Sequence, residues 1–256
     1  MSVLTSKRTT PRLNEIIKGV RSYYIIGDIA LVSPKEEVNK EELAEALMKI
    51  NPRIKSVFIR KKVKGELRVN ELVFAGGEYK TTTVYKETGL RFKVDISKVY
   101  VNVSLSSERD KLEKEVECKK VLADLFTSYG AIAIHLARKC NYVIAGDLNI
   151  DGLYLLKESL NLNKLKGNID IVQYDAHYLP FRDKSVDIGV ADNPTMIESF
   201  KSEVCRVCKE AIFYILCKSK DEATQKLGEA DWVRVNDYSK DLFIFKGRVR
   251  CDNEKS

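Results

Sequence analysis

The second half of this 256-residue chain predicts an α/β domain with a doubly wound parallel sheet, and two observations support this prediction. From Val121 onward, short apolar strands alternate with helices, which is the order that places successive strands parallel in one sheet. Aspartates stand at or just after the ends of three of these strands, where such sheets bind their ligands. We therefore expect a Rossmann-like domain, preceded by a small α+β domain.

The first half, residues 1–98, is expected to have antiparallel strands. Residues 23–32 are two apolar strands with a turn at Gly27 and Asp28. Lys40–Ile50 carries apolar side chains at the spacing of one helix face, which predicts an amphipathic helix. The further expected strands are residues 56–60, 67–74, 81–85 and 90–94, of which the last two form a hairpin that turns at Thr88 and Gly89.

The second domain, residues 119–256, is expected to follow a linker of residues 99–118. Its expected strands are residues 121–126, 142–147, 170–174, 186–191 and 211–217, and a final pair at 232–238 and 242–249. Its expected helices are residues 131–139, residues 152–163, and one helix between the strands that end at Ala191 and begin at Ala211.

Positive charge is concentrated in the first part of the chain. Residues 1–110 contain 21 lysines and arginines against 14 aspartates and glutamates, whereas residues 111–256 contain 23 of each kind. This segregation favours a polyanion as the partner of the first half, and nucleic acid is the commonest one. The apolar stretches are too short to cross a membrane and the first residues do not resemble a signal peptide, so a cytoplasmic protein is expected.

The six cysteines do not form paired clusters of metal ligands, and no metal is expected. Cys205 and Cys208 form a single CxxC pair in a chain with only two histidines, which favours thiols packed on a helix over a zinc or redox site. The sequence leaves a disulfide open if the protein comes from a hyperthermophile.

Three aspartates are candidates for holding a nucleotide-like cofactor. Asp124 and Asp147 end the first two strands of the second half, and Asp175 follows the third. Asp147 lies 17 residues after Gly130, a spacing that suits a carboxylate that accepts hydrogen bonds from both hydroxyls of a ribose. Asp175 is placed to accept a hydrogen bond from an adenine amino group.

The loop after the first strand indicates which cofactor binds. Residues 127–131 contain one glycine, Gly130, and no lysine of the phosphate-binding kind. Dinucleotide sites need three glycines so that pyrophosphate can approach the helix N-terminus, whereas S-adenosylmethionine has no phosphate. S-adenosylmethionine is therefore the expected cofactor, and its expected contacts are Asp124, Leu125, Phe126, Thr127, Gly130, Asp147, Leu148, Asp175 and Ala176.

The fourth strand ends in Asp192, Asn193 and Pro194, a polar pair held before a proline. At the carboxyl end of a strand, this pair is expected to point into the ligand cleft. Methyltransferases that modify ring or exocyclic nitrogens grip the target base at this position. A strand-terminating turn is the alternative explanation.

With these motifs, the chain resembles the archaeal and eukaryotic tRNA (guanine-37, N1)-methyltransferases. Four stretches carry the resemblance, namely residues 24–30, residues 92–100, residues 105–109, and residues 124–126 with Asp147. The wybutosine-pathway aminocarboxypropyltransferases share this architecture and cofactor. The resemblance implies a class I methyltransferase domain and a tRNA anticodon stem-loop as the partner, and we expect a monomer without metal.

The resemblance also implies roles for individual residues. Tyr100 and Glu108 match linker residues beside the target guanine, and Glu108 would accept the proton of guanine N1. Arg68 matches an arginine that stabilises charge developing on guanine O6. Asp192 or, after a shift of one residue, Asn193 matches the asparagine of the family's Asn-x-Pro motif. The guanine must leave its stack before its N1 can be reached.

Departures from the family pattern leave alternatives open. The family usually has glycine where this chain has Ser128, and an arginine near Ser104 that reaches towards the methionine end of the cofactor. The family's N-terminal domain that reads the tRNA corner is also expected to be missing, as it is in the aminocarboxypropyltransferases. Methylation of guanosine 37 is the leading hypothesis, and aminocarboxypropyl transfer or a tRNA-binding protein without catalysis are the alternatives.

Overall fold

The computed structural model describes residues 20, 23–65, 69–118 and 120–251, which divide into two compact units. The first unit comprises the described residues up to Tyr85 together with Val94–Val101. The second unit comprises Lys86–Lys93 and the described residues from Asn102 onward. Each unit has a hydrophobic core of its own.

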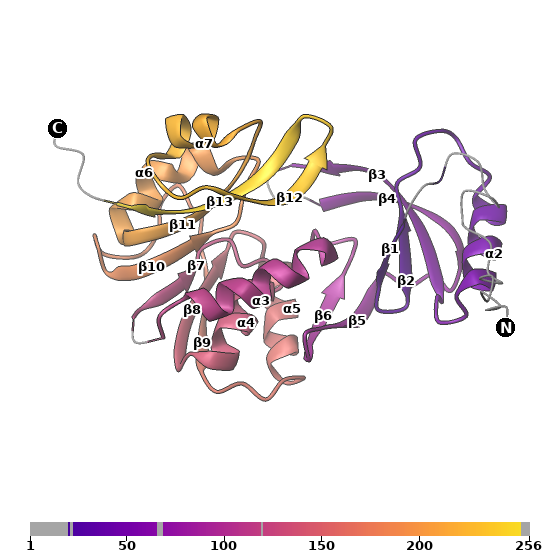
Figure 1. Cartoon of the computed structure of the whole chain (residues 1–256). Helices are drawn as coiled ribbons and strands as arrows, with labels where there is room; N and C mark the ends of the chain where they lie inside the picture. The colour runs from indigo at the N-terminus through magenta and orange to yellow at the C-terminus, as the bar shows by residue number, and fades with distance from the viewer. Residues whose placement is uncertain (1–19, 21–22, 66–68, 119, 252–256) are drawn as a thin grey trace, which may run out of the picture. The chain divides into compact units, whose positions relative to one another are not determined.

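The first unit is a four-stranded sheet with one helix (Figure 1). The Asn39 side chain caps the helix by accepting a hydrogen bond from the N–H of Glu42 at 3.1 Å. The helix buries Leu43, Ala44 and Leu47, and it packs on the third and fourth strands. The elements are β1 (Tyr23–Ile26), β2 (Ile29–Val32), α2 (Lys40–Ile50), β3 (Ser56–Lys64) and β4 (Val69–Gly77).

The connectivity of this sheet differs from the expected antiparallel arrangement. β1 pairs antiparallel with β2, and β3 with β4, but β2 and β3 are parallel because α2 crosses over between them. β3 also continues beyond residues 56–60 to Lys64, so that the exposed Lys61 and Lys62 lie on a strand rather than in a turn. Arg68 lies outside the described residues.

β5 (Thr82–Glu87) and β6 (Leu90–Asp95) form the expected hairpin, whose tip belongs to the second unit. The turn residues Thr88 and Gly89 have φ angles of +47° and +86°. Positive φ at both positions is the geometry of the two-residue turn that matches the twist of the flanking strands. The turn that the sequence predicts is therefore confirmed.

The second unit is built on a seven-stranded sheet with the order β12-β13-β11-β10-β7-β8-β9. β7 to β11 pair in parallel, whereas β13 is antiparallel to β11 and to β12. The strand order reverses between β7 and β10, so the carboxyl ends of these two strands form the topological switch point. The strands are β7 (Leu122–Asp124), β8 (Tyr142–Asp147), β9 (Asn168–Gln173), β10 (Val186–Ala191), β11 (Cys208–Cys217), β12 (Val233–Ser239) and β13 (Leu242–Arg250).

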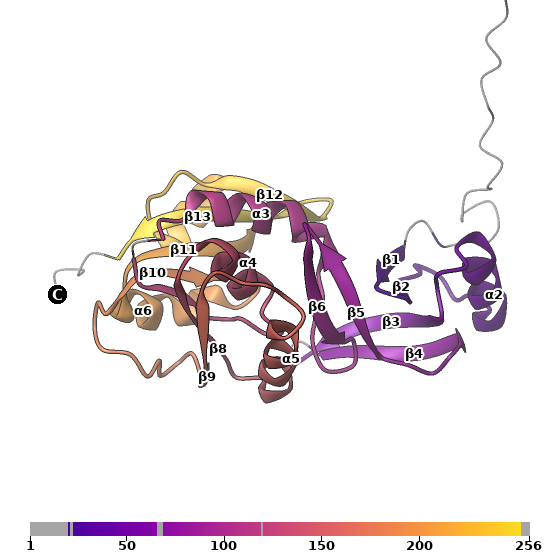
Figure 2. The ribbon, with the colours of Figure 1, turned by 90° about the horizontal axis from the view of Figure 1, so that it is seen from below.

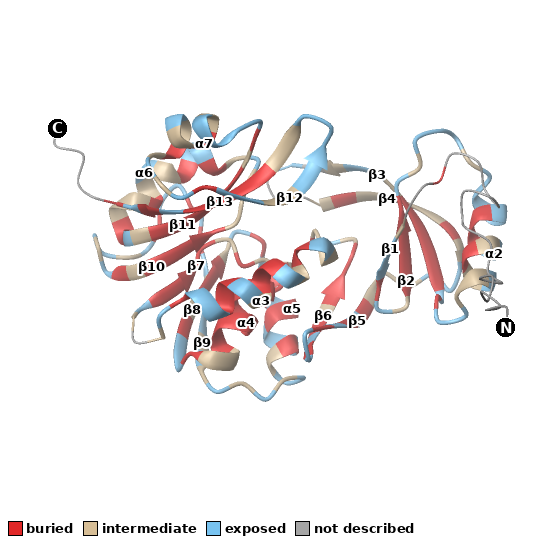
Figure 3. Cartoon of the chain, in the orientation of Figure 1, coloured by how far each residue is buried: buried red, intermediate tan, exposed pale blue. Residues whose placement is uncertain are grey.

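Helices cover both faces of this sheet, and α3 and α4 lie on the opposite face from α6 (Figures 1 and 2). α4 packs on β7, β8 and β9, α5 on β8 and β9, α6 on β10 and β11, and α7 on β11 and β13. Buried residues concentrate in the strands between these layers (Figure 3). The helices are α3 (Ser106–Glu115), α4 (Ala131–Lys139), α5 (Ile150–Leu160), α6 (Ile197–Val207) and α7 (Lys220–Leu227).

The doubly wound α/β fold is confirmed, and two helices add to the expected elements. α3 lies inside the segment expected as a linker, after a 3₁₀ turn at Val103–Leu105, and α7 lies between β11 and β12. The buried face of α3 consists of Glu108, Arg109, Leu112 and Glu113, so it lacks the apolar period by which a helix is recognised. None of the helices in the described ranges combines the length and the apolar character needed to cross a membrane.

Disulfides correct the expectation for the CxxC pair. Cys205 is bonded to Cys251 across 46 residues, and Cys118 is bonded to Cys140 across 22 residues. Cys208 is a buried free thiol at the start of β11. The CxxC pair is split because α6 ends between its two cysteines, and β11 brings the end of β13 to Cys205.

Candidate active site

Asp124 stands at the carboxyl end of β7, beside the switch point, and its side chain is buried. Its Oδ2 accepts hydrogen bonds from Oγ1 of Thr127 at 2.7 Å and from the N–H of Ala133 at 3.0 Å. Its Oδ1 is buried and has no hydrogen-bond partner among the described residues. A buried carboxylate oxygen without a donor costs free energy, so this atom is a suitable acceptor for a ligand.

The loop after β7 keeps the backbone geometry of a glycine-containing loop. Ser128 has a φ of +48°, in the left-handed region that glycine adopts without strain. The backbone N–H of Ser128 donates to Oδ2 of Asp147 at 2.7 Å. Gly130 has a φ of +88°, and a Cβ atom there would lie 2.2 Å from Cδ1 of Leu156. The serine therefore changes the residue but leaves the loop conformation that a glycine would give.

Asp147 ends β8, and both of its carboxylate oxygens hold backbone groups. Oδ2 accepts from Ser128, and Oδ1 accepts from the N–H of Asn149 at 2.8 Å. Each oxygen keeps a further lone pair that a ribose hydroxyl can use. Leu148, the next residue, is 40% exposed, so it offers an apolar surface that suits a flat ring such as adenine.

Asp124, Asp147 and Asp192 gather negative charge at the carboxyl ends of β7, β8 and β10, and we call them the carboxylate cluster. Burial, and to a smaller extent the charges of Asp192 and Asp147, raise the pKa of Asp124 to about 7. Loss of hydration also raises the pKa of Asp147. A site of this kind attracts a cationic ligand and disfavours phosphates.

The Asp192-Asn193-Pro194 segment forms a turn after β10. The carbonyl of Asn193 accepts a hydrogen bond from the N–H of Met196 at 3.0 Å, and the carbonyl of Pro194 accepts one from the N–H of Leu216 at 2.8 Å. Oδ1 of Asn193 is buried and has no hydrogen-bond partner among the described residues. The segment is thus a turn fixed to β11 that also holds an unpartnered amide oxygen.

Asp175 follows β9 but is exposed and lies outside the carboxylate cluster. Its Oδ1 accepts a hydrogen bond from the N–H of His177 at 2.9 Å and lies 2.7 Å from Nδ1 of the same residue. These hydrogen bonds lower the pKa of Asp175. The ring of His177 lies 4.5 Å from the ring of Phe200, which lies 5.1 Å from the ring of Phe126. Contact between Asp175 and adenine remains a prediction.

Glu108 lies in the first turn of α3 and is buried. Its Oε1 lies 2.7 Å from Nζ of Lys246 and accepts a hydrogen bond from the hydroxyl of Tyr214 at 3.2 Å. Nζ of Lys246 also lies 2.6 Å from Oε2 of Glu115. The proposed proton acceptor therefore belongs to a buried polar group that joins α3 to the sheet.

Three further residues are singled out by the family pattern. Tyr100 belongs to the first unit and is half-buried, with the guanidinium carbon of Arg60 lying 5.7 Å from its ring centroid. Arg68 lies outside the described residues. Ser104 is exposed, and its hydroxyl accepts a hydrogen bond from the side chain of Asn236 at 3.1 Å.

A buried network of charges fastens the hairpin tip to α3 and α4. The guanidinium of Arg109 donates to both carboxylate oxygens of Glu87 at 2.7 Å, and His135 lies between Glu87 at 2.9 Å and Glu113 at 3.2 Å. Although burial opposes the charge, His135 and Arg109 lower the pKa of Glu87 to about 2. Glu113 and His135 belong to a group with the spacing of metal ligands, but the guanidinium of Arg138 already donates to Glu113 at 3.0 Å.

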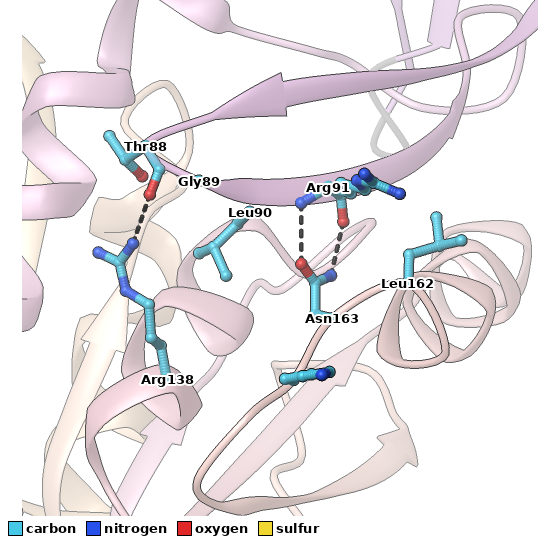
Figure 4. A pocket seen from close by; sticks show the side chains of 8 residues that line it. Thr88, Gly89, Leu90, Arg91, Arg138, Leu162 and Asn163 are labelled. Carbon is cyan, nitrogen blue, oxygen red and sulfur yellow. Dashed lines mark hydrogen bonds between the residues drawn. The ribbon is translucent and has the colours of Figure 1, made fainter.

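A pocket of about 520 Å³ lies between the hairpin tip and the ends of α4 and α5 (Figure 4). Asn163 exchanges hydrogen bonds of 2.8 and 2.7 Å with the backbone of Arg91, and Arg138 donates to the carbonyl of Thr88 at 2.6 Å. α4 and α5 begin at the carboxyl ends of the strands and end near their amino ends. The pocket therefore lies at the amino ends of the strands, whereas the carboxylate cluster lies at their carboxyl ends. Its lining includes the exposed side chains of Arg91 and Lys164.

Sequence reasoning missed Tyr214 and Lys246, which stand opposite each other in the register of β11 and β13. The only signal was a lysine inside the apolar stretch of residues 242–249, and such a lysine needs a buried partner. Nothing in the sequence identified Glu108 as that partner.

The chain matches the model of the TRM5/TYW2 methyltransferase domain over residues 83–226 and that of the TYW2 N-terminal domain over residues 8–80. It is 34% identical over 154 residues to the tRNA (guanine(37)-N(1))-methyltransferase Trm5b of Pyrococcus abyssi, covering 59% of this chain and 47% of that protein. It is 32% identical over 209 residues to Trm5b of Methanocaldococcus jannaschii, covering 79% of this chain and 61% of that protein. The chain thus spans about half to three fifths of the length of these relatives.

Solved structures show the same architecture. The complex of aTrm5 with tRNALeu is 26% identical, with a TM-score of 0.82 that covers 96% of this chain and 80% of that one. The M. jannaschii tRNA m1G37 methyltransferase is 26% identical, with a TM-score of 0.79 over 90% of this chain and 72% of that one. The P. horikoshii TYW2 in complex with MeSAdo, at 19% identity and a TM-score of 0.74, shares the fold and covers 93% of this chain and 92% of that one. The chain belongs to the TRM5/TYW2 methyltransferase family.

Proposed function

We propose that this chain is an S-adenosylmethionine-dependent tRNA methyltransferase that acts on N1 of guanosine 37. The observation that carries this proposal is the carboxylate cluster at the switch point, with unpartnered buried oxygens on Asp124 and Asn193. Such a site accepts a cation that also brings hydrogen-bond donors, and S-adenosylmethionine has a sulfonium, an amino group and ribose hydroxyls. The relatives that carry the name tRNA (guanine(37)-N(1))-methyltransferase support the choice of reaction.

The cofactor fits the residues at this end of the sheet. Asp147 would accept from its ribose hydroxyls, Leu148 would contact its adenine, and Asp124 would face its charged methionine end. When bound, S-adenosylmethionine supplies a methyl group activated by the sulfonium. Further contacts are proposed from chain position alone for Leu125, Phe126, Thr127, Gly130, Asp175 and Ala176.

The reaction at guanine N1 requires a proton acceptor, because N1 carries a proton at neutral pH. Glu108 is proposed for this role. Asn193, or Asp192 beside it, would hold the edge of the base at the end of β10. Tyr100 and Arg68 are proposed from the family resemblance alone, Tyr100 beside the guanine and Arg68 at O6, where a guanidinium stabilises developing negative charge.

The tRNA partner is supported by charge as well as by the relatives. The excess of lysine and arginine over acidic residues falls entirely within residues 1–110. Arg91 and Lys164 at the pocket of Figure 4 add two exposed cations in the second unit, and we propose that they contact phosphates of the tRNA.

Aminocarboxypropyl transfer is the second candidate, and one observation favours it. Residues 8–80 match the model of the TYW2 N-terminal domain, so the first half of this chain resembles TYW2. Both reactions use the same cofactor, but they break different bonds at sulfur.

An experiment with two labels separates the candidates. Purified protein is incubated with tRNA that has guanosine at position 37, using S-adenosylmethionine labelled either in its methyl group or in its carboxyl carbon. A tRNA with adenosine at position 37 serves as the control. We expect the methyl label alone to enter the tRNA, and only with guanosine present. Entry of the carboxyl label would establish the second candidate, and entry of neither label would refute both.

A further inference from the structure

Glu108 is held by two residues that stand opposite each other on neighbouring strands. Tyr214 on β11 and Lys246 on β13 are register partners, so their side chains leave the sheet on the same face. Both are buried, with 1% and 8% of their surface exposed. A cross-strand pair is a rigid platform, because its two backbones are fixed by the ladder of hydrogen bonds.

The two partners contact the same oxygen of Glu108. Lys246 and Tyr214 both reach Oε1, at 2.7 and 3.2 Å. Oε2 receives no hydrogen bond from the described residues. One oxygen is therefore anchored, whereas the other keeps its lone pairs for a further donor.

A second carboxylate balances the lysine. Nζ of Lys246 lies 2.6 Å from Glu115, whose side chain is 52% exposed, so the ammonium is shared between two acids. Although burial opposes its charge, the pair of glutamates raises the pKa of Lys246. Two carboxylates and one ammonium sum to one negative charge, so the group can take up a proton without becoming positive.

Tyr214 also links this group to the carboxylate cluster. Burial, and then the charges of Glu108 and Asp192, raise the pKa of Tyr214 well above its usual value, so its hydroxyl remains a donor. Ala191 on β10 and Phe213 on β11 are register partners, so Asp192 and Tyr214 are the next residues along these two neighbouring strands.

We propose that Tyr214 and Lys246 are positioning residues that fix Oε1 of Glu108 so that Oε2 receives the proton of guanine N1. This inference rests on the proposed methylation. In that step, the electron pair of the N1–H bond forms the bond to the methyl carbon and the proton passes to Oε2. The electron pair of the S–CH₃ bond stays on sulfur, and S-adenosylhomocysteine leaves. Glu115 sets the charge of the group so that Glu108 remains a usable acceptor.

The test measures the pH profile of single-turnover methylation. Lys246→Met removes the ammonium that favours the ionised carboxylate, so the acid limb should move to higher pH by about 1 to 3 units. Lys246→Arg should restore the wild-type limb. Glu115→Gln leaves the ammonium to Glu108 alone, so the limb should move slightly to lower pH. Arg248 lies on the same strand as Lys246 and forms an ion pair with Glu210 on β11, so Arg248→Met is the matched control and should leave the profile unchanged.

Tyr214→Phe keeps the ring in the core and removes only the hydroxyl. It therefore tests the positioning of Glu108 even if Lys246→Met fails to fold. We expect its rate to fall about 10-fold, within the range for a misplaced catalytic group. A binding measurement that needs no turnover compares tRNA carrying guanosine with tRNA carrying 1-methylguanosine at position 37, which lacks the N1 proton. Wild type should prefer guanosine, and Glu108→Gln, Tyr214→Phe and Lys246→Met should each lose that preference.

The outcomes separate the two proposals. An active wild type whose Tyr214→Phe and Lys246→Met variants keep its pH profile and its preference for guanosine would overturn the positioning role alone. A wild type that methylates no guanosine N1 would overturn both the positioning role and the proposed function.

Discussion

Replacing Asp124 by asparagine should stabilise the second unit at neutral and alkaline pH while it weakens cofactor binding. In the native protein, Thr127 and Ala133 donate hydrogen bonds to Oδ2 of Asp124, and the amide oxygen of asparagine can accept both. It also replaces the unpartnered Oδ1 with an amide nitrogen and removes a buried charge that lies beside Asp147 and Asp192. The native residue is therefore held at a cost in stability.

The magnitude follows from the pKa of Asp124, which burial and the neighbouring acids raise from 3.8 to about 7. A rise of about 3 units corresponds to about 4 kcal/mol. Because the pKa of Asp124 is higher in the folded than in the unfolded state, the folded state is most stable when this carboxyl is protonated. The free energy of unfolding is therefore highest below pH 4 and falls as the pH rises to about 7. We expect Asp124→Asn to be more stable than wild type by about 2 to 4 kcal/mol at pH 8, after allowing for an imperfect hydrogen bond of the amide.

The assay is urea unfolding without cofactor between pH 4 and pH 8, followed by the fluorescence of Trp232. This is the single tryptophan of the chain and is buried in the second unit, so it reports on the relevant core. The difference in unfolding free energy between variant and wild type should grow as the pH rises. A variant that is destabilised equally at pH 4 and pH 8 would show that the charge of Asp124 does not lower the stability of the second unit.

Three further predictions concern the loop, a disulfide and the pocket. Ser128→Gly should raise the unfolding free energy by about 0.5 to 1 kcal/mol, because relief of the left-handed strain exceeds the entropy lost by glycine, and a lower urea midpoint would contradict it. Replacing Cys205 and Cys251 by serine opens a loop of 46 residues and should cost about 4 kcal/mol, whereas an unchanged thermal midpoint would show that the bond contributes nothing. Replacing both Arg91 and Lys164 by alanine should make the plot of log tRNA affinity against log salt concentration less steep by about 2, and it should leave the affinity for S-adenosylmethionine unchanged. An unchanged slope would show that the pocket does not contact the RNA.

Elements with a strong apolar pattern could be predicted residue by residue. Ala131–Lys139, Tyr142–Asp147 and Val186–Ala191 have in the structure the bounds that the sequence predicts. These segments are nearly all apolar or small, because they lie in or against the centre of a parallel sheet. The order of these segments was enough to predict a doubly wound sheet with Asp124 at the end of its first strand.

Features that depend on register or on distant pairing could not be predicted. Glu108 meets Tyr214 only because β11 and β13 pair in one register, and that register is a property of the folded sheet. Helix α3 was missed because its buried face is largely charged, and those charges are satisfied by partners that lie far away in sequence, such as Glu87 for Arg109. Parallel pairing of β2 and β3 depends on the crossover through α2, whereas the antiparallel pairs on either side, β1 with β2 and β3 with β4, favour an all-antiparallel reading of the sequence.

Mass spectrometry of the nucleosides of tRNA incubated with this protein and S-adenosylmethionine tests the proposed methylation of guanosine 37. We expect 1-methylguanosine to appear, guanosine to be lost in equal amount, and Glu108→Gln to abolish the product while the protein still binds the cofactor. A nucleoside that carries an aminocarboxypropyl group, or tRNA that remains unmodified, would rule out this methylation.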